Sequence, residues 1–169
     1  MVILDKSYAY IPPCWHDYEN LPFVNEEFND QESLAQWRAL GYTQTKFTGD
    51  MYDMRRPEPV WMPKIREHFN WQHFSWSLYR MGPGTVLPPH RDTYTRFREI
   101  YNVSDPKKIC RAIIFLRNWE SGHYFEINGQ IISSWTAGDT YIWRWDLEHA
   151  AANVGKTPRY TLQITGIAK

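Results

Sequence analysis

The chain has little cysteine and no long apolar run, and both features exclude classes of protein. It contains two cysteines in 169 residues. Cys14 and Cys110 form no CxxC motif and no cluster with histidine, which excludes a disulfide framework and a thiolate zinc site. No apolar stretch reaches the roughly 20 residues of a membrane-spanning helix, and the opening MVILDKSYAY lacks the basic start and long apolar run of a signal peptide. We therefore expect a cytoplasmic protein with reduced thiols.

The chain also lacks a net charge, with 19 basic and 19 acidic residues. A neutral chain has no overall field that attracts phosphate backbones or anionic lipids. We therefore expect a small molecule, a peptide or a protein as substrate, and neither a membrane nor a nucleic acid as the main partner. A local basic groove formed by Arg96, Arg98 and Lys107 would overturn this preference in favour of nucleic acid.

Aromatic residues are abundant and make up 17% of the chain, with nine tryptophans and eleven tyrosines. Large rings pack well on the pleated faces of sheets, so the simplest interpretation is a β-rich core. The alternative is a dedicated aromatic binding surface. Because exposed rings could belong to an interface or to the core, the composition does not define the oligomeric state.

The chain contains no repeats or low-complexity segments, but its pattern of secondary-structure signals changes near residue 70. Residues 1–70 carry helix and loop signals, whereas residues 71–169 carry strand signals. We expect both parts to share one core and to form a single domain over residues 1–169.

Two helices are predicted in the first part. Asn29 or Asp30 provides a cap and Gly41 a stop signal, and the apolar residues between them recur at helical spacing. A second helix is predicted within VWMPKIREHFNW, where Pro63 makes it short or delays its start.

From Gln72 onward, apolar and polar residues alternate with the period of a β-strand. In HFSWSLYRM, one face carries Phe74, Trp76 and Leu78, and the other carries Ser75, Ser77 and Tyr79. Further strands are predicted in CRAIIFLRNW, TYIWRW and RYTLQITGIA, and a hairpin is predicted around Asn128-Gly129, the preferred pair for a type I′ turn. Roughly eight short strands without intervening helices predict a mainly β fold with N-terminal helices, whose core is a jelly roll or barrel.

The sequence PPHRD, residues 88–92, holds the first residues that could carry chemistry. The prolines disfavour a helical backbone, so His90 and Asp92 should be extended and should point the same way. Joined by a second imidazole, such a pair forms the two-histidine, one-carboxylate triad of non-haem iron oxygenases. About 0.3 HxD motifs are expected by chance in a chain of this composition, so the pair alone also fits a loop histidine beside a solvated aspartate.

Two further signals lie near the C-terminus. His149 follows the predicted strand TYIWRW, and Arg159 opens the predicted strand RYTLQITG ten residues later. Alternation places Arg159, Thr161 and Gln163 on one face of that strand. A guanidinium beside a hydroxyl suits a carboxylate, which accepts bidentate bonds from arginine and one more from threonine. Taken singly, Arg159 also fits a surface cation and His149 a histidine without a metal. Their order and spacing favour a site.

The arrangement HRD…GDTYIWRWDLEHAAANVGKTPRYTLQITG resembles the catalytic core of the Fe(II)/2-oxoglutarate-dependent oxygenases, with the likeness spread over residues 71–169. The resemblance implies a double-stranded β-helix core of the jelly-roll, cupin-like type, with Fe(II) held by His90, Asp92 and His149. It also implies that Arg159 and Thr161 bind the distal carboxylate of 2-oxoglutarate and that dioxygen is consumed. The segments CRAIIFL and SWTAGDTYIW are similar to those of the aspartyl/asparaginyl and prolyl hydroxylase group.

Within that group, an arginine on the strand after the first metal ligand contacts the cosubstrate, and Arg111 is the matching position. Tyr79 matches a position that places a hydroxyl near the cosubstrate carboxylate. Asp92 is a departure, because many β-hydroxylases of the aspartyl group lack the metal carboxylate. Its presence aligns the chain with the wider superfamily and favours hydroxylation over halogenation. Because of this difference, the resemblance does not define the substrate. Desaturation or ring closure also stays open as the reaction.

The resemblance implies a hydroxylase that converts 2-oxoglutarate to succinate and carbon dioxide while it oxidises a C–H bond. Two alternatives stay open: a cupin-like isomerase or hydrolase that uses zinc or manganese, and a non-enzymatic β-barrel module whose aromatic residues bind a peptide or sugar. The polar segment of residues 93–110 is either a substrate lid over the metal or a solvated connection.

Overall fold

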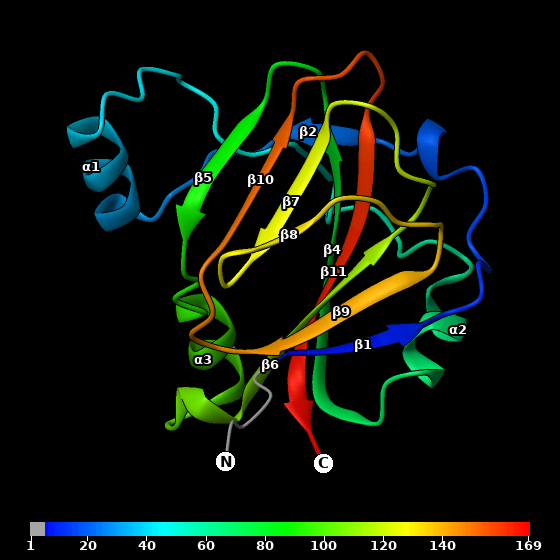
Figure 1. The fold of residues 1–169 in the computed structure, drawn as a ribbon. Coiled ribbons are helices and arrows are strands. Elements are labelled where there is room, and N and C mark those ends of the chain that lie inside the picture. Colours follow the sequence, from blue (N-terminus) through cyan, green and yellow to red (C-terminus); the bar gives the residue numbers. More distant parts are fainter. Residues whose placement is uncertain (1–5) are drawn as a thin grey trace.

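The computed structural model describes residues 6–169, which form two antiparallel sheets that face each other (Figure 1). The larger sheet, in the order β1-β9-β6-β11-β4-β3-β2, consists of β1 (Lys6–Tyr10), β2 (Phe23–Asn25), β3 (Asp50–Tyr52), β4 (Trp71–Met81), β6 (Ile109–Phe115), β9 (Asp139–Arg144) and β11 (Arg159–Ala168). The smaller sheet, in the order β5-β10-β7-β8, consists of β5 (Val86–His90), β7 (His123–Ile127), β8 (Gln130–Ile132) and β10 (His149–Asn153). Two facing antiparallel sheets connected in this way form the predicted jelly roll.

The N-terminal helices lie where the sequence predicts them. α1 (Gln31–Ala39) begins after Asp30, whose side chain accepts a hydrogen bond from the backbone N–H of Glu32, and Gly41 follows it at φ +97°. α2 (Met62–Glu67) is short and has Pro63 in its first turn. A short 3-10 turn, η1 (Tyr18–Asn20), precedes both. No helix in the described part of the chain is long and apolar enough to cross a membrane.

The strands follow the predicted pattern with several additions. Asn128 and Gly129 join β7 to β8 with φ of 51° and 74°, as the predicted hairpin turn requires. β1, β2 and β3 extend the larger sheet into residues 1–70, where the sequence predicts helices and loops. β10 has the sequence HAAAN, whose run of alanines has no period of two and gives no strand signal.

Residues 93–110, which the sequence leaves open between a substrate lid and a solvated connection, contain regular secondary structure. They form α3 (Thr95–Tyr101) and a 3-10 turn, η2 (Pro106–Lys108). Tyr94, Phe97 and Val103 are buried in a small cluster with Ile109. The segment therefore packs through an apolar layer of its own, while its cations Arg96, Lys107 and Lys108 are exposed.

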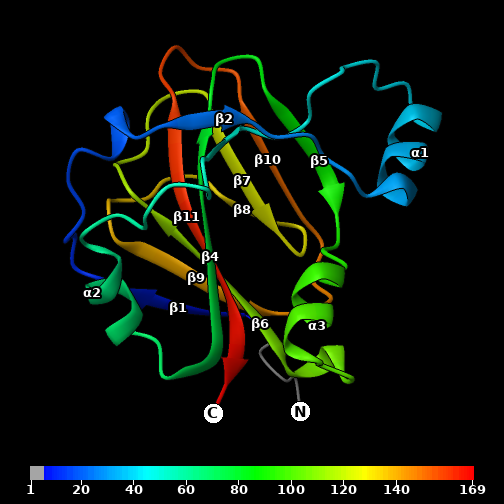
Figure 2. The ribbon, with the colours of Figure 1, turned by 180° about the vertical axis from the view of Figure 1, so that it is seen from behind.

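Aromatic and aliphatic side chains fill the two faces of the larger sheet. Between the sheets, Phe115 stacks on Trp135 at 4.0 Å and meets Phe125 edge-on at 5.5 Å between ring centroids. On the outer face, α2 contributes the fully buried Met62 and Ile65 to a second apolar layer (Figure 2). The rings therefore serve mainly to build the predicted β-rich core.

The Phe115→Ala substitution should lower the free energy of unfolding by about 3–5 kcal/mol, because it leaves a cavity between the sheets. Urea denaturation followed by tryptophan fluorescence measures the change. Ile131→Ala on β8, at a residue that is 58% exposed, is the control and should change the free energy by less than about 0.5 kcal/mol. Equal effects of the two substitutions would contradict this account of the core.

Candidate metal centre

The pairing of β5 with β10 brings two histidines together. His90 is the last residue of β5, His149 is the first residue of β10, and the two are direct partners in the antiparallel register. Both are buried. Pro88 and Pro89 fit in β5 because it is an edge strand of the smaller sheet. Directly opposed residues place their side chains on the same face, so the strands bring both imidazoles to one point.

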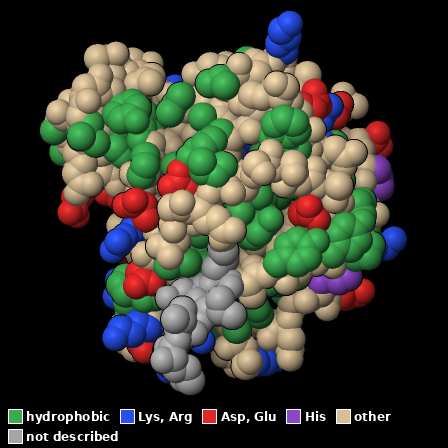
Figure 3. All heavy atoms as spheres, viewed as in Figure 1, with side chains coloured by type: hydrophobic (Ala, Val, Ile, Leu, Met, Phe, Trp, Pro, Cys, Tyr) green, Lys and Arg blue, Asp and Glu red, His purple; other side chains and the backbone are tan. Residues whose placement is uncertain are grey.

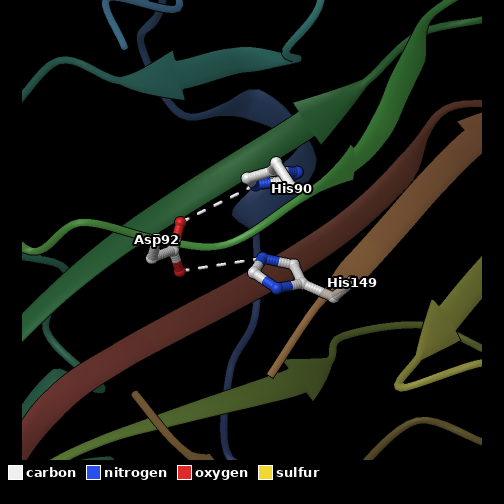
Figure 4. A group of neighbouring side chains, drawn as sticks. All are labelled: His90, Asp92 and His149. Atoms are coloured by element: carbon white, nitrogen blue, oxygen red, sulfur yellow. Dashed lines mark ion pairs between the residues drawn. The ribbon is translucent and has the colours of Figure 1, made fainter. Parts of the chain in front are cut away.

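Asp92 lies just beyond β5 and completes a cluster of three possible metal ligands (Figure 4). Its Oδ1 lies 3.7 Å from Nε2 of His90, and its Oδ2 lies 3.7 Å from Nε2 of His149. All three ligand atoms lie within 4.8 Å of one another. Ligand atoms about 2.1 Å from one ion are about 3.0–3.4 Å apart at adjacent positions. A small inward movement of the side chains would therefore fit an ion between them.

Backbone carbonyl groups fix the tautomer of both imidazoles. His90 Nδ1 lies 2.9 Å from the carbonyl oxygen of Pro88, and His149 Nδ1 lies 3.1 Å from that of Leu147. A carbonyl oxygen only accepts, so each Nδ1 donates its hydrogen and each Nε2 keeps its lone pair. This outer contact is typical of metal-binding histidines, whose second nitrogen is held by a carbonyl or carboxylate.

Arg111 on β6 holds the carboxylate from the larger sheet. Its Nε and Nη2 donate to Asp92 Oδ2 at 3.1 and 2.8 Å, and its Nη1 donates to Thr165 Oγ1 at 2.8 Å. Burial by itself would raise the pKa of Asp92, but the Arg111 guanidinium and then the nearby imidazoles hold it well below its usual range. Burial, followed by the neighbouring His90, lowers the pKa of His149 to about 4. The cluster at neutral pH thus offers an ionised carboxylate and the neutral His149 imidazole.

Two aromatic side chains from the N-terminal part support His90. Phe28 and Trp37 meet its ring edge-on, with centroids at 5.5 and 5.8 Å. Trp37 Nε1 also donates to the carbonyl oxygen of Pro89 at 3.0 Å. The sequence predicts Trp37 only as an apolar residue of a helix and gives no signal for Phe28, because both contacts depend on where α1 docks beside β5 (Figure 1).

A cavity of about 160 Å³ lies at the cluster. Besides the three candidate ligands, its lining includes Tyr79, Arg111, Gln163 and residues 26–29. Tyr79 and Arg111, which the resemblance places near the cosubstrate, therefore face the candidate metal centre. Burial raises the pKa of Tyr79 to about 12, so its hydroxyl stays protonated at neutral pH and is able to donate. Gln163 belongs to the predicted polar face of β11, but the sequence does not distinguish it as a site residue.

Arg159 and Thr161 lie further along β11 and do not line this cavity. Arg159 is only 5% exposed, its Nη1 donates to the carbonyl oxygen of Tyr124 at 3.3 Å, and its Nε has no hydrogen-bond partner. Burial lowers the pKa of Arg159 to about 10, with no carboxylate among the described residues to offset it. A buried cation without an anion is unfavourable, so the guanidinium of Arg159 would be stabilised by a neighbouring negative charge.

The donor set narrows the identity of the metal. Two imidazole nitrogens and one carboxylate oxygen suit Fe(II) and leave coordination positions for other ligands, and they also suit zinc or manganese. Among residues 6–169, no other group of three or more histidine, cysteine, aspartate or glutamate side chains lies close enough to hold an ion.

No protein-family model matches this chain, and no curated protein matches it. Among solved structures, SnoN, the non-heme alpha ketoglutarate dependent epimerase of nogalamycin biosynthesis, is similar with a TM-score of 0.56 and 12% identity over 95% of this chain and 78% of that chain. A prolyl-4-hydroxylase of Pseudomonas putida gives 0.48 at 14% identity over 82% and 84% of the two chains. A predicted oxalate decarboxylase of Thermotoga maritima gives 0.42 at 13% over 70% and 79%.

Likeness at such low identity defines a shared fold and no more. It confirms the predicted mainly β architecture with a double-stranded β-helix core of the cupin type. Fold and site together make this chain a double-stranded β-helix protein with a candidate two-histidine, one-carboxylate metal centre.

In the metal-free protein, His149 should stay neutral until the pH falls to about 4, with its proton on Nδ1. The unfolded chain takes up this proton near pH 6.5. The free energy of unfolding should therefore fall as the pH drops from about 6.5 to about 4, because the unfolded state binds the additional proton.

Long-range ¹H–¹⁵N NMR spectra report both the tautomer and the titration, and urea denaturation reports the stability. The His149→Gln variant should lose this part of the pH dependence. An Nε2–H tautomer, or a titration near pH 6.5, would contradict the arrangement described for His149.

Proposed function

We propose that this chain is an Fe(II)- and 2-oxoglutarate-dependent oxygenase that hydroxylates a C–H bond of a small molecule, an amino acid or a peptide side chain, with release of succinate and carbon dioxide. The observation that carries the proposal is the convergence of His90, Asp92 and His149, with both Nε2 atoms facing the carboxylate. The buried guanidinium of Arg159 supports it, since an acidic cosubstrate would supply the missing anion. SnoN, which shares the fold, is described as alpha ketoglutarate dependent.

His90, Asp92 and His149 would hold the metal. When bound together with 2-oxoglutarate, Fe(II) supplies the activation of dioxygen that an unreactive C–H bond requires. The chain's own contribution is positioning. Backbone carbonyls keep both Nε2 atoms available, and Arg111 keeps the carboxylate ionised and oriented.

Two sets of side chains are available for the acid groups of 2-oxoglutarate. Tyr79 and Arg111 line the metal cavity, and Arg159 and Thr161 lie further along β11. We assign the distal carboxylate to Arg159, because Arg111 is already neutralised by Asp92 whereas Arg159 has no anion. A carboxylate should bind more strongly to the unpaired guanidinium of Arg159 than to Arg111, which already pairs with Asp92. The Tyr79 hydroxyl would donate a hydrogen bond to a carboxylate of 2-oxoglutarate from the cavity at the candidate metal centre.

Anaerobic addition of Fe(II) and 2-oxoglutarate should give the weak visible charge-transfer band of the chelated 2-oxo acid. The Asp92→Ala and His149→Ala variants should lose this band, and their succinate formation should fall by about 100-fold or more, since each loses a direct metal ligand. His68→Ala is the control, because His68 is an exposed residue at the end of α2.

Other outcomes of this experiment favour the alternatives. Tight binding of zinc or manganese that His149→Ala abolishes, without a band for Fe(II) and 2-oxoglutarate, would favour a cupin-like isomerase or hydrolase. Absence of metal binding by the unmodified chain would favour a binding module without catalysis. Succinate formation at the native rate in either alanine variant would contradict the ligand assignment.

Arg159→Met should weaken the binding of 2-oxoglutarate about 10- to 100-fold, because hydrogen bonds to a charged group contribute about 1.5–3 kcal/mol. The same substitution should leave the ligand-free protein equally stable or more stable, since an apolar side chain replaces a buried cation without an anion. Calorimetric titration and thermal unfolding measure the two effects.

Arg66→Met is the matched control, because Arg66 pairs with Glu58 at the surface. It should leave the affinity for 2-oxoglutarate unchanged. A large loss of stability in Arg159→Met, with unchanged affinity, would assign Arg159 to the structure of the fold instead.

A further inference from the structure

A second and larger hollow opens beside the metal cavity. Its volume is about 1170 Å³, which exceeds the roughly 300–1,000 Å³ of typical small-molecule pockets. The two hollows share the lining residues Glu26, Asn29, Tyr79 and Arg111. We call the larger one the entry cleft, because it leads to the candidate metal centre. Residues of β4 and α3 line it, so the segment predicted as a possible lid forms part of its wall.

Along the entry cleft, β4 has an edge without a partner strand. β11 pairs with β4 along almost its whole length, whereas β3 pairs only with Tyr79 and Arg80. Within residues 6–169, no strand lies on the β3 side of residues 71–78, and residues 75–77 line the cleft. The N–H and C=O groups on such an edge are a template for an added strand.

The lining of the entry cleft has more carboxylates than cations. Its carboxylates without an ion pair in the described part of the chain are Glu26, Asp30 and Glu99. The lining contains two cations, Arg96 and Arg111. Arg111 forms an ion pair with Asp92, whereas Arg96 forms no ion pair within the described residues. Burial raises the pKa of Glu26, with no neighbouring cation to oppose it. Figure 3 shows the opposite side of the molecule, where β5, β7, β8 and β10 lie nearest the viewer and acidic and basic side chains are interspersed.

Tyr94 adds a buried hydroxyl to this wall. The residue is 7% exposed, and its hydroxyl has no hydrogen-bond partner. Its ring lies 5.1 Å from the Arg111 guanidinium carbon, and its φ of 54° is a costly backbone conformation for an aromatic residue. The hydroxyl interacts electrostatically with Asp92 and Arg111, so Tyr94 connects the wall of the cleft to the candidate metal centre.

We propose that the entry cleft binds an extended peptide with a basic side chain, added as a strand to the free edge of β4, and that Glu26 pairs with the basic group where the cleft meets the metal cavity. The free edge favours an extended chain, and the excess of carboxylates favours a basic one. That the basic side chain is also the group that becomes oxidised rests on the proposed function. Peptide binding itself requires neither metal nor cosubstrate.

Fluorescence anisotropy with three labelled heptapeptides tests the proposal on the full metal-free chain. The peptides share one serine and valine background and differ at the central residue, which is lysine, norleucine or glutamate. The lysine peptide should bind about tenfold more tightly than the norleucine peptide, and the glutamate peptide should bind least. N-methylation of alternate backbone amides should weaken the lysine peptide about tenfold or more, because it removes donors that strand pairing needs.

The Glu26→Gln variant should reduce the preference for lysine over norleucine to about one, with the affinity for norleucine unchanged. Glu67→Gln is the matched control, since Glu67 is an exposed residue of α2 outside the cleft. A preference that survives in Glu26→Gln, or an affinity that N-methylation leaves unchanged, would overturn the proposal.

Two other occupants give distinct results. Butylamine that binds as tightly as the lysine peptide would assign the cleft to a small cation. A concentration-dependent dimer in analytical ultracentrifugation that excludes the peptide would assign the edge to a second copy of the chain. Either result would overturn the peptide proposal. Intact peptide binding without a band for Fe(II) and 2-oxoglutarate would reject the proposed oxygenase alone.

Discussion

The candidate centre depends on one backbone register, in which β5 and β10 pair so that His90 lies opposite His149. A slip of one residue would turn one of the imidazoles to the other face of the smaller sheet. The register changes between His149 and Ala151, directly after the candidate ligand His149. Such irregularities commonly redirect side chains next to active sites. Pro88 lies within β5, Asp92 follows β5 by two residues and Leu147 precedes β10 by two, so their positions depend on the same register.

The larger sheet supplies the positive charges that the smaller sheet lacks. Arg111 on β6 is neutralised by Asp92, whereas Arg159 on β11 is buried without an anion. Low local dielectric strengthens the first pair and makes the second cation unfavourable. A fold stabilised by large stacked rings between its sheets, such as Phe115 on Trp135, can carry this unfavourable group. The difference between the two arginines is the physical reason to assign an external carboxylate to Arg159.

Features that depend on neighbouring residues could be predicted from the sequence. The Asp30 cap and the Asn128-Gly129 turn require only local geometry. The candidate ligands could also be found locally, because His90 and Asp92 lie in an extended segment and His149 follows a predicted strand. β10 could not be predicted, because its alanines are defined as a strand by pairing with β5 and β7 on either side.

The remaining features of the site arise from docking between distant segments. The contact of Trp37 with His90 and the place of Glu26 at both hollows depend on how the N-terminal part meets β5, and no local pattern records such a contact. The same holds for α3. Its sequence TRFREIY is mostly polar, and it folds onto the sheet through the buried ring of Phe97. A mostly polar segment is therefore not always a solvated loop, because a single aromatic side chain such as Phe97 can pack it onto a sheet.

Arg111 is the point at which the entry cleft and the candidate metal centre meet. It lines both hollows, binds Asp92 and Thr165, and lies over the ring of Tyr94. A ligand in the cleft that contacts Arg111 or Tyr94 would change the electrostatic field at Asp92 without any movement of the strands. Because the pair is buried, little water screens that change. Occupancy of the cleft and the electrostatic field at Asp92 are thus coupled through one side chain, Arg111.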